Sequence, residues 1–264
     1  MPLASIRDTQ IYFEIVGDGT PLVLVTGQGS GPEGRAELIN ALARSHSVLT
    51  YDQRGTGRSD RGPEGQPIPE LAEDIVALMD HVGFASAHIV GHSTGTGMAT
   101  VVAATYPERT SGLVLAAPWT HADDHLRTIQ EMRKAAARTM PPAHYAQFNA
   151  LLLYPPEFRR ANSKRFAEMA EAALRTPQDA TSISARLDAI LAFDARPSYP
   201  RIARPTLVLS ARDDQVMPYW FADHAAQAIP DAQLIAFDGG GHMFVETRTR
   251  DVLDVIIPFL DAVV

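Results

Sequence analysis

The sequence predicts an α/β protein with a mostly parallel, eight-stranded sheet and helices on both of its faces. Short apolar runs that suit buried strands alternate with segments of helical spacing over residues 1–118 and 194–264. Between them, residues 119–193 contain helical segments and no convincing strand. The chain has 264 residues, 45% of them hydrophobic, which is enough to bury a large core. We therefore expect one core domain, formed by 1–118 and 194–264, with a helical cap, 119–193, inserted into it.

The chain opens with two segments rich in strand-forming residues, separated by the turn residues Asp8-Thr9, which predicts an antiparallel hairpin. Apolar runs such as PLVLV at Pro21–Val25 predict strands buried on both faces. Apolar residues at helical spacing predict helices. The expected elements before the cap are, in order, strands Ser5–Arg7, Gln10–Val16 and Pro21–Val25, helix Glu37–Ala43, strand Val48–Tyr51, helix Ile68–Val82, strand His88–Val90, a helix through Met98–Thr105, and strand Gly112–Ala116.

The segment 119–193 is interrupted by the proline pairs Pro141-Pro142 and Pro155-Pro156, which divide it into several short helices. After it the alternation of strands and helices resumes, which implies that the same mostly parallel sheet continues. The expected elements there are strand Thr206–Ser210, helix Trp220–Ala228, strand Leu234–Phe237 and helix Asp251–Ala262.

Charge and composition exclude several classes of protein. The formal net charge is -8, which disfavours a nucleic-acid partner because such proteins concentrate Lys and Arg on one face. The chain has no cysteine, so it has neither disulfides nor cysteine metal sites. We find neither a signal-peptide pattern nor an apolar stretch long enough for a membrane span. We expect a cytoplasmic protein that binds neither nucleic acid nor membrane. Its oligomeric state, monomer or homodimer, stays open.

The sharpest local motif is Gly91-His92-Ser93-Thr94-Gly95, directly after an expected strand and before an expected helix. A G-x-S-x-G motif in that context is a nucleophile elbow, a turn so tight that small residues must stand on both sides of the serine. The following helix directs its first N–H groups towards negative charge that develops beside Ser93. The motif predicts Ser93 as a nucleophile.

A serine needs a general base and a carboxylate that orients the base, and after an elbow serine these follow in the order acid, then histidine. The loop after Thr206–Ser210 carries Asp213 and Asp214. The loop after Leu234–Phe237 is a glycine run that ends in His242. Of the nine histidines, His242 alone has this order and this loop, and His92 is expected to face away from the nucleophile.

Backbone N–H groups supply the oxyanion hole of such a site, and we expect Thr94 to donate one and Gln28 the other. Gly27-Gln28-Gly29-Ser30-Gly31 has only part of a dinucleotide fingerprint, because Pro32 stands where a third glycine belongs, and no Walker motif occurs. We expect no cofactor.

The segment His121-Ala122-Asp123-Asp124-His125 spaces two histidines as metal ligands on a helix are spaced. A helix start explains the same residues, with Thr120 as N-cap and acidic residues in the first turn. We favour the helix start and expect no metal.

With these residues placed, the chain resembles the α/β-hydrolase superfamily along nearly its whole length. The segment Asp52–Ser59 is similar to the D-x-R-G-x-G-x-S loop of that superfamily, and Gly241-His242 with Glu246 resembles its histidine loop. Counted from Asp214, Pro218 matches the acid loop, so the resemblance implies that Asp214, rather than Asp213, is the acid. Thr26 and Thr96 depart from the pattern, standing where a histidine and a glycine often occur. Within the superfamily, YDQRGTG, the segment 151–156 and the two aspartates resemble aminoacrylate hydrolases and 3-oxoadipate enol-lactonases.

The leading hypothesis is a hydrolase of a small carboxylic ester, lactone or amide-like C–N compound, acting through an acyl-enzyme. The resemblance implies a substrate with a carboxylate or another polar group. Two alternatives stay open: cleavage of a C–C bond in a vinylogous diketone, and a receptor that binds a small ligand without turnover. Trp119, where the expected cap begins, is the candidate pocket residue. An enclosing cap predicts a small substrate.

Overall fold

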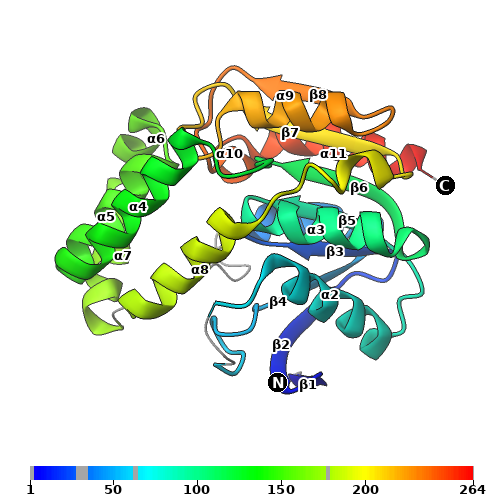
Figure 1. The fold of residues 1–264 in the computed structure, drawn as a ribbon, viewed down its shortest axis with the longest axis horizontal. Coiled ribbons are helices and arrows are strands. Elements are labelled where there is room, and N and C mark those ends of the chain that lie inside the picture. The colour runs from blue at the N-terminus through cyan, green and yellow to red at the C-terminus, as the bar shows by residue number, and fades with distance from the viewer. Residues whose placement is uncertain (1–2, 28–34, 62–64, 177–178, 264) are drawn as a thin grey trace.

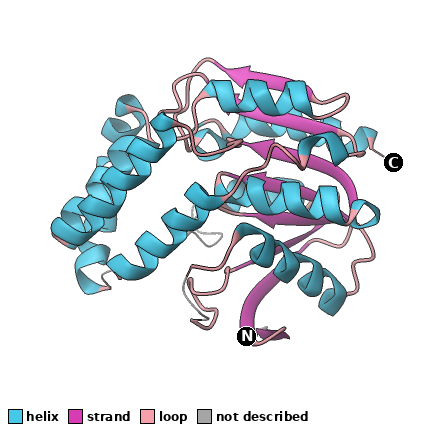
Figure 2. Cartoon of the chain, in the orientation of Figure 1, coloured by secondary structure: helices cyan, strands magenta, loops and turns pink. Residues whose placement is uncertain are grey.

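The computed structural model describes residues 3–27, 35–61, 65–176 and 179–263. Within these ranges eight strands form one sheet in the order β1-β2-β4-β3-β5-β6-β7-β8, with helices on both faces (Figures 1 and 2). The predicted fold class is confirmed. The strands are β1 Leu3–Ile6, β2 Thr9–Val16, β3 Thr20–Val25, β4 His46–Tyr51, β5 Ala87–His92, β6 Thr110–Ala116, β7 Thr206–Ala211 and β8 Gln233–Phe237.

The first two strands run antiparallel and the rest of the sheet is parallel. β1 pairs with β2 in antiparallel fashion, as the expected hairpin requires. β2 also pairs antiparallel with β4. From β4 through β3, β5, β6 and β7 to β8, every pairing is parallel. The inner strands β3, β5, β6 and β7 are buried almost throughout, which is why they read as continuous apolar runs in the sequence.

Helices cover the two faces of this sheet. On one face α3 packs against β5 and β6, with α2 beside it, and α9 packs against β7 and β8. These three helices lie in front of the sheet in Figure 1. The helices α1 and α11 contact each other. The helices of the core are α1 Ala36–Leu42, α2 Ile68–Val82, α3 Thr94–Thr105, α9 Tyr219–Ala228, α10 Phe244–Thr247 and α11 Thr249–Ala262, with 3-10 turns η1 Pro107–Arg109 and η2 Tyr199–Arg201.

The chain between β6 and β7 forms helices that stand beside the carboxyl ends of the strands, at the left of Figure 1. Here α5 packs against α7, and α4 against α8. Prolines begin α5 and α6, as the two proline pairs suggested. These helices are α4 Asp124–Thr139, α5 Pro142–Leu153, α6 Pro156–Ala161, α7 Ser163–Arg175 and α8 Ala180–Ala192. They fall within 119–193, and their treatment as a separate cap domain stays a prediction.

One local expectation was wrong. The N-cap of α4 is Asp123, whose Oδ1 accepts a hydrogen bond from the backbone N–H of Leu126 at 2.8 Å. Thr120 instead contacts the ring of its neighbour His121 at 2.9 Å. The helix starts at Asp124, and an N-cap side chain must lie within about three residues of the N–H groups that it accepts from, so Asp123 serves and Thr120 is too far from the helix. In the described part of the chain, no helix is long and apolar enough to span a bilayer.

Candidate active site

Ser93 occupies a strained turn between β5 and α3. Its backbone has φ 55° and ψ -124°, a conformation that L-residues rarely adopt. A Cβ on Gly91 would lie 2.7 Å from the carbonyl oxygen of Gly95, and a Cβ on Gly95 would lie 2.1 Å from that of Val25. The two glycines of the motif are therefore required because the turn folds onto itself and onto β3.

Three side chains far apart in the sequence form one chain of hydrogen bonds. The Ser93 hydroxyl lies 2.8 Å from Nε2 of His242, and Nδ1 of His242 lies 2.8 Å from Oδ2 of Asp214. The three residues are 8%, 3% and 3% exposed, in the order Ser93, Asp214, His242. The parallel strands β5, β7 and β8 deliver them, since all three residues follow the carboxyl ends of these strands. With the Nδ1 proton directed at the carboxylate, Nε2 can accept the serine proton.

The two aspartates of the loop after β7, Asp213 and Asp214, make different contacts. Asp214 Oδ1 accepts hydrogen bonds from the backbone N–H groups of Val216 and Met217, at 2.8 and 2.9 Å, which fixes the carboxylate that meets His242. Asp213 accepts from the N–H groups of Gly240 and Gly241, at 3.2 and 2.8 Å. Asp213 thus secures the backbone of the histidine loop, a role that sequence reasoning missed.

His92 contacts the histidine loop. The sequence predicted that His92 faces away from Ser93 and did not predict this contact. Its Nε2 lies 3.0 Å from the main-chain oxygen of His242, and its Nδ1 lies 3.4 Å from a guanidinium nitrogen of Arg35. Since arginine can only donate, Nδ1 accepts and Nε2–H donates to His242. Burial, and then the charge of Arg35, hold the pKa of His92 well below its ordinary value. The ring is therefore neutral and supports the backbone of the histidine loop.

Of the two expected oxyanion donors, the structure describes one. Thr94 is the first residue of α3, so its backbone N–H has no partner within the helix. Gln28 lies outside the described residues. The last described residue of that loop, Gly27, lies close to Ser93: a Cβ there would lie 3.0 Å from Cβ of Ser93. The loop after β3 therefore reaches Ser93.

The segment after β4 supports the same loop. Gln53 donates to the carbonyl oxygen of Thr26 at 2.8 Å, immediately before Gly27. Asp52 closes the turn by accepting from the backbone N–H of Arg58 at 2.9 Å. Gly57 has φ 53°, and a Cβ there would lie 2.4 Å from the Asp52 carboxylate. This D-x-R-G-x-G-x-S segment thus acts on the site indirectly, through the backbone of Thr26.

A polar cluster joins the helices after β6 to the histidine loop. The Glu246 carboxylate pairs with the guanidinium of Arg165, from α7, and accepts a hydrogen bond from the Tyr154 hydroxyl at 3.0 Å. Leu153, just before Tyr154, accepts from the backbone N–H of Met243 at 3.1 Å. Burial, reinforced by the charge of Glu246, raises the pKa of Tyr154, so its hydroxyl stays protonated and donates. The resemblance had singled out Glu246, but not this contact.

The candidate pocket residue Trp119 is packed tightly. It is 1% exposed, its ring lies 5.6 Å from that of Phe193, and its Nε1–H donates to the carbonyl of Ile190 at 3.3 Å. A Cβ on Gly97, in α3, would lie 2.6 Å from the indole. These contacts join the elbow helix to the end of α8, and the assignment of Trp119 to the substrate pocket stays a prediction.

The histidines considered as metal ligands have other contacts. His125 lies 2.8 Å from the carbonyl of Gln215, and Asp123 caps α4 while accepting from Nε1 of Trp220 at 3.0 Å. Among the residues described, no group of three or more His, Cys, Asp or Glu side chains could bind a metal ion.

Comparison with known proteins agrees with the fold. The model of the α/β hydrolase fold family matches residues 20–249. A protein of Azorhizobium caulinodans named "Putative carbamate hydrolase RutD" is 36% identical over 258 residues, 97% of each chain. A protein of the same name from Caulobacter vibrioides is 30% identical over 257 residues, 95% of each chain. The enol-lactonase of Burkholderia xenovorans superposes with a TM-score of 0.87 at 25% identity, covering 98% of this chain and all of that one. The chain therefore belongs to the α/β-hydrolase fold family and is a hydrolase.

Proposed function

We propose that this protein hydrolyses a small carboxylic ester, lactone or amide-like C–N substrate, with Ser93 as nucleophile, His242 as general base and Asp214 as the carboxylate that orients His242. The observation that carries the proposal is the continuous hydrogen-bond chain from Ser93 through His242 to Asp214, beginning at a serine with φ 55°. The relatives named as carbamate hydrolases support the C–N arm of the substrate class, and the enol-lactonase neighbour supports the lactone arm.

In the proposed mechanism, Ser93 Oγ attacks the substrate carbonyl while its proton moves to Nε2 of His242. The N–H groups of Thr94 and Gln28 stabilise the oxyanion, and Asp214 stabilises the imidazolium. The imidazolium then protonates the leaving alcohol or amine, which leaves an acyl group on Ser93. Water, deprotonated by His242, attacks the acyl carbon and releases the carboxylic acid and the free serine. This sequence consumes one water and needs no other reactant.

We also propose that residues 119–193 act as a cap that encloses a small substrate. Helices α4–α8 stand beside the strand ends that carry the three residues (Figure 1). Direct contacts from Leu153 and Tyr154 to the histidine loop support this placement. An enclosed site favours small substrates over long acyl chains. We propose no nucleic-acid partner, in keeping with the net charge of -8.

A fluorophosphonate tests the nucleophile. It should label the wild-type protein and fail to label Ser93→Ala. Ser210→Ala is a matched control, because Ser210 is also buried at the carboxyl end of a strand, and this variant should label normally. Absence of labelling in the wild type would favour a receptor without turnover.

A product-resolved screen then tests the reaction. The panel contains activated esters, lactones, carbamates, amides and a vinylogous diketone. If the protein turns over only the diketone, its reaction is C–C cleavage and not acyl transfer from an oxygen or nitrogen leaving group. If kcat/KM for the esters rises steadily with acyl chains longer than about eight carbons, the proposal of an enclosed pocket is wrong and the substrate binds in an open groove.

A further inference from the structure

The side-chain hydroxyl of Thr94 is buried next to Ser93, and it has no hydrogen-bond partner among the residues that the structure describes. Thr94 is 5% exposed. A buried hydroxyl without a partner lowers the stability of a protein, because it has given up its hydrogen bonds to water and gained none in return. A hydroxyl in this state beside a proposed nucleophile points to a partner that arrives with the substrate.

The position of Thr94 in α3 explains why its hydroxyl lacks the acceptor that helical threonines ordinarily use. Inside a helix a threonine hydroxyl can donate to the carbonyl oxygen of the preceding turn, as Thr128 donates to Asp124 at 2.7 Å. Thr94 is the first residue of α3, so the residues of the preceding turn belong to β5 and to the elbow. Thr96, two residues further on, already donates to the carbonyl oxygen of Ser93 at 2.7 Å. The hydroxyl of Thr94 is therefore left for a partner outside its own helix.

The helix geometry directs the Thr94 side chain towards the carboxyl ends of the strands. Residues three apart share a face of a helix, so Thr94 lies on the face that carries Gly97. A Cβ on Gly97 would lie 2.6 Å from the indole of Trp119 and 3.2 Å from the ring of Phe193. Helical side chains also tilt towards the N-terminus of their helix, and the N-terminus of α3 adjoins Ser93. Thr94 therefore lies between Ser93 and the segment at Trp119 where the predicted cap begins.

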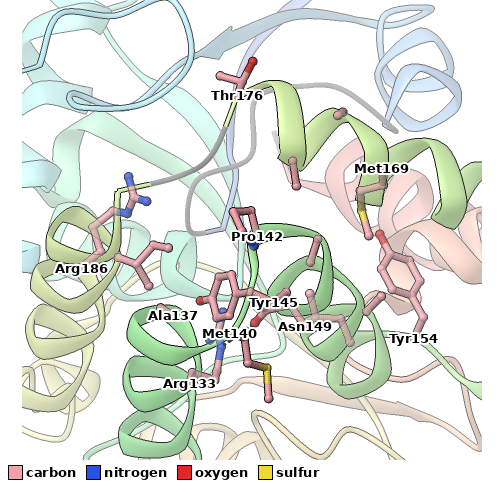
Figure 3. A pocket seen from close by; sticks show the side chains of 16 residues that line it. Arg133, Ala137, Met140, Pro142, Tyr145, Asn149, Tyr154, Met169, Thr176 and Arg186 are labelled. Atoms are coloured by element: carbon pink, nitrogen blue, oxygen red, sulfur yellow. Dashed lines mark hydrogen bonds between the residues drawn. The ribbon is translucent and has the colours of Figure 1, made fainter.

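A separate cavity of about 480 Å³ lies between α4, α5, α7 and α8 (Figure 3). Its described lining includes neither Thr94 nor Ser93. A group that binds the Thr94 hydroxyl would thus lie beside Ser93 and not in this cavity.

We infer that the Thr94 hydroxyl determines specificity by forming a hydrogen bond with a polar acyl group, one that carries an oxygen or nitrogen atom on the carbon next to the carbonyl. This role rests on the proposed hydrolysis. The backbone N–H of Thr94 is the proposed donor to the carbonyl oxygen, and the hydroxyl of the same residue can reach only an atom close to that oxygen. In the proposed mechanism His242 protonates the leaving group, so the leaving group lies on the His242 side of Ser93. The acyl group is then the part of the substrate that meets Thr94.

Two phenyl esters of nearly equal size test this role. Phenyl methoxyacetate has an oxygen on the carbon next to the carbonyl, and phenyl butyrate has a CH₂ group there. Thr94→Val removes the hydroxyl but keeps the shape of the side chain and the backbone N–H, whereas Thr94→Ser keeps the hydroxyl. We expect Thr94→Val to lower kcat/KM for the methoxyacetate about fivefold or more relative to the butyrate, and Thr94→Ser to keep most of the wild-type ratio. An equal fall for both esters, or no fall for either, would overturn the inference.

Urea unfolding without substrate separates this role from a structural one. Thr94→Val replaces a buried hydroxyl that has no partner, so its unfolding midpoint should equal or exceed that of the wild type. Thr96→Val is the matched control, because it removes the hydrogen bond to the carbonyl oxygen of Ser93 and should unfold at a lower urea concentration. If Thr94→Val is destabilised as much as Thr96→Val, the hydroxyl serves the fold and the inference is wrong.

A binding experiment decides the same question without turnover. Isothermal titration of Ser93→Ala with the two esters, with and without Thr94→Val, gives the ratio of their dissociation constants. Thr94→Val should weaken binding of the methoxyacetate about fivefold or more relative to the butyrate. If the wild type hydrolyses neither ester, the proposed hydrolysis loses its support and this titration alone decides the role of Thr94. An unchanged ratio, or no binding of either ester at millimolar concentration, would then overturn the inference.

Discussion

The imidazole of His92 donates a hydrogen bond to the main-chain oxygen of His242, at 3.0 Å, across a sequence separation of 150 residues. The two rings lie 5.3 Å apart between centroids. His92, the residue before Ser93, thus supports the backbone of His242, the proposed general base. The hydroxyl of Ser93, the proposed nucleophile, contacts the side chain of His242. Two consecutive residues at the end of β5, His92 and Ser93, therefore contact the backbone and the side chain of His242.

The first prediction follows from this contact. His92→Phe removes the donor but keeps a flat ring against Phe244, so the protein should fold while kcat/KM falls about tenfold, the equivalent of one lost hydrogen bond to the loop. His92→Gln keeps an N–H donor and should lose less. Steady-state kinetics on the best substrate of the screen measure both. Wild-type kinetics in a folded His92→Phe protein would remove His92 from the support of His242.

The two aspartates of the loop after β7 should differ in their effect on rate. Asp214→Asn leaves His242 without its carboxylate and should lower kcat by about 10⁴-fold. Asp213→Asn should keep most of the rate, because its amide oxygen can still accept the shorter of the two hydrogen bonds, from Gly241, and only the longer one, from Gly240, is lost. Burst and steady-state kinetics on the two variants compare them directly. The assignment of Asp214 is wrong if Asp213→Asn loses most of its kcat while Asp214→Asn keeps most of it.

Gly95→Ala tests the close approach of the elbow to β3. The added Cβ would lie 2.1 Å from the carbonyl oxygen of Val25, which belongs to a buried strand, so we expect a loss of roughly 3 kcal/mol or more in unfolding free energy. Gly55→Ala is the control, since Gly55 has φ 76° and no atom of the described residues lies within 4 Å of its would-be Cβ. It should cost only about 1 kcal/mol, the penalty of the left-handed conformation. Denaturant titration gives both values, and similar losses would contradict the packing argument.

Arg165 should contribute to stability through Glu246. The Glu246 side chain is 9% exposed, whereas that of Arg165 is 41% exposed, so removal of the arginine leaves a buried carboxylate short of one partner. Arg165→Ala should lower the unfolding free energy by about 1 kcal/mol, a value reduced for solvent screening. Lys164→Ala, at the adjacent position, should have no measurable effect, because Lys164 is 91% exposed and lies 3.8 Å from Glu168. Equal midpoints for the two variants in urea would show that the Arg165 pair contributes nothing.

The protein should become less stable in mild acid because of buried histidines. Burial, with a smaller effect of His46, lowers the pKa of His88 to about 4, while the nearby Asp261 acts in the opposite direction. The unfolded chain then binds the proton first, so stability is complete above about pH 6.5 and falls as the pH drops towards 4. The loss from His88 is at most about 1.4 kcal/mol per pH unit. Burial also lowers the pKa of His92, so His92 adds to the loss of stability in acid.

Urea unfolding at pH 7.5, 6, 5 and 4.5 measures this slope. His88→Phe should flatten it, because His88 Nδ1 has no hydrogen-bond partner among the residues that the structure describes and the variant has no proton to take up there. His81→Gln, at an exposed position, is the control and should keep the slope. A slope that is unchanged in His88→Phe would assign the acid sensitivity to other groups.

The sequence by itself determined the strand and helix order and the three residues of the proposed hydrogen-bond chain. Buried parallel strands leave apolar runs in the sequence, and the residues that follow those runs must gather at one edge of the sheet. The tight turn at Ser93 and the glycine run before His242 are local features, so motifs record them. The late start of α4 was misjudged because Thr120 and Asp123 are equally good caps, and only the path of the chain chooses between them.

Only the tertiary structure decided which other residues support the site. His92, Asp213 and Glu246 act through hydrogen bonds to backbone or side chains on distant segments, and no periodicity or spacing records such a partner. The physical reason is that a hydrogen bond forms wherever the fold brings a donor and an acceptor together, and the relative positions of segments far apart in the chain depend on the packing of helices and strands and not on neighbouring residues in the sequence.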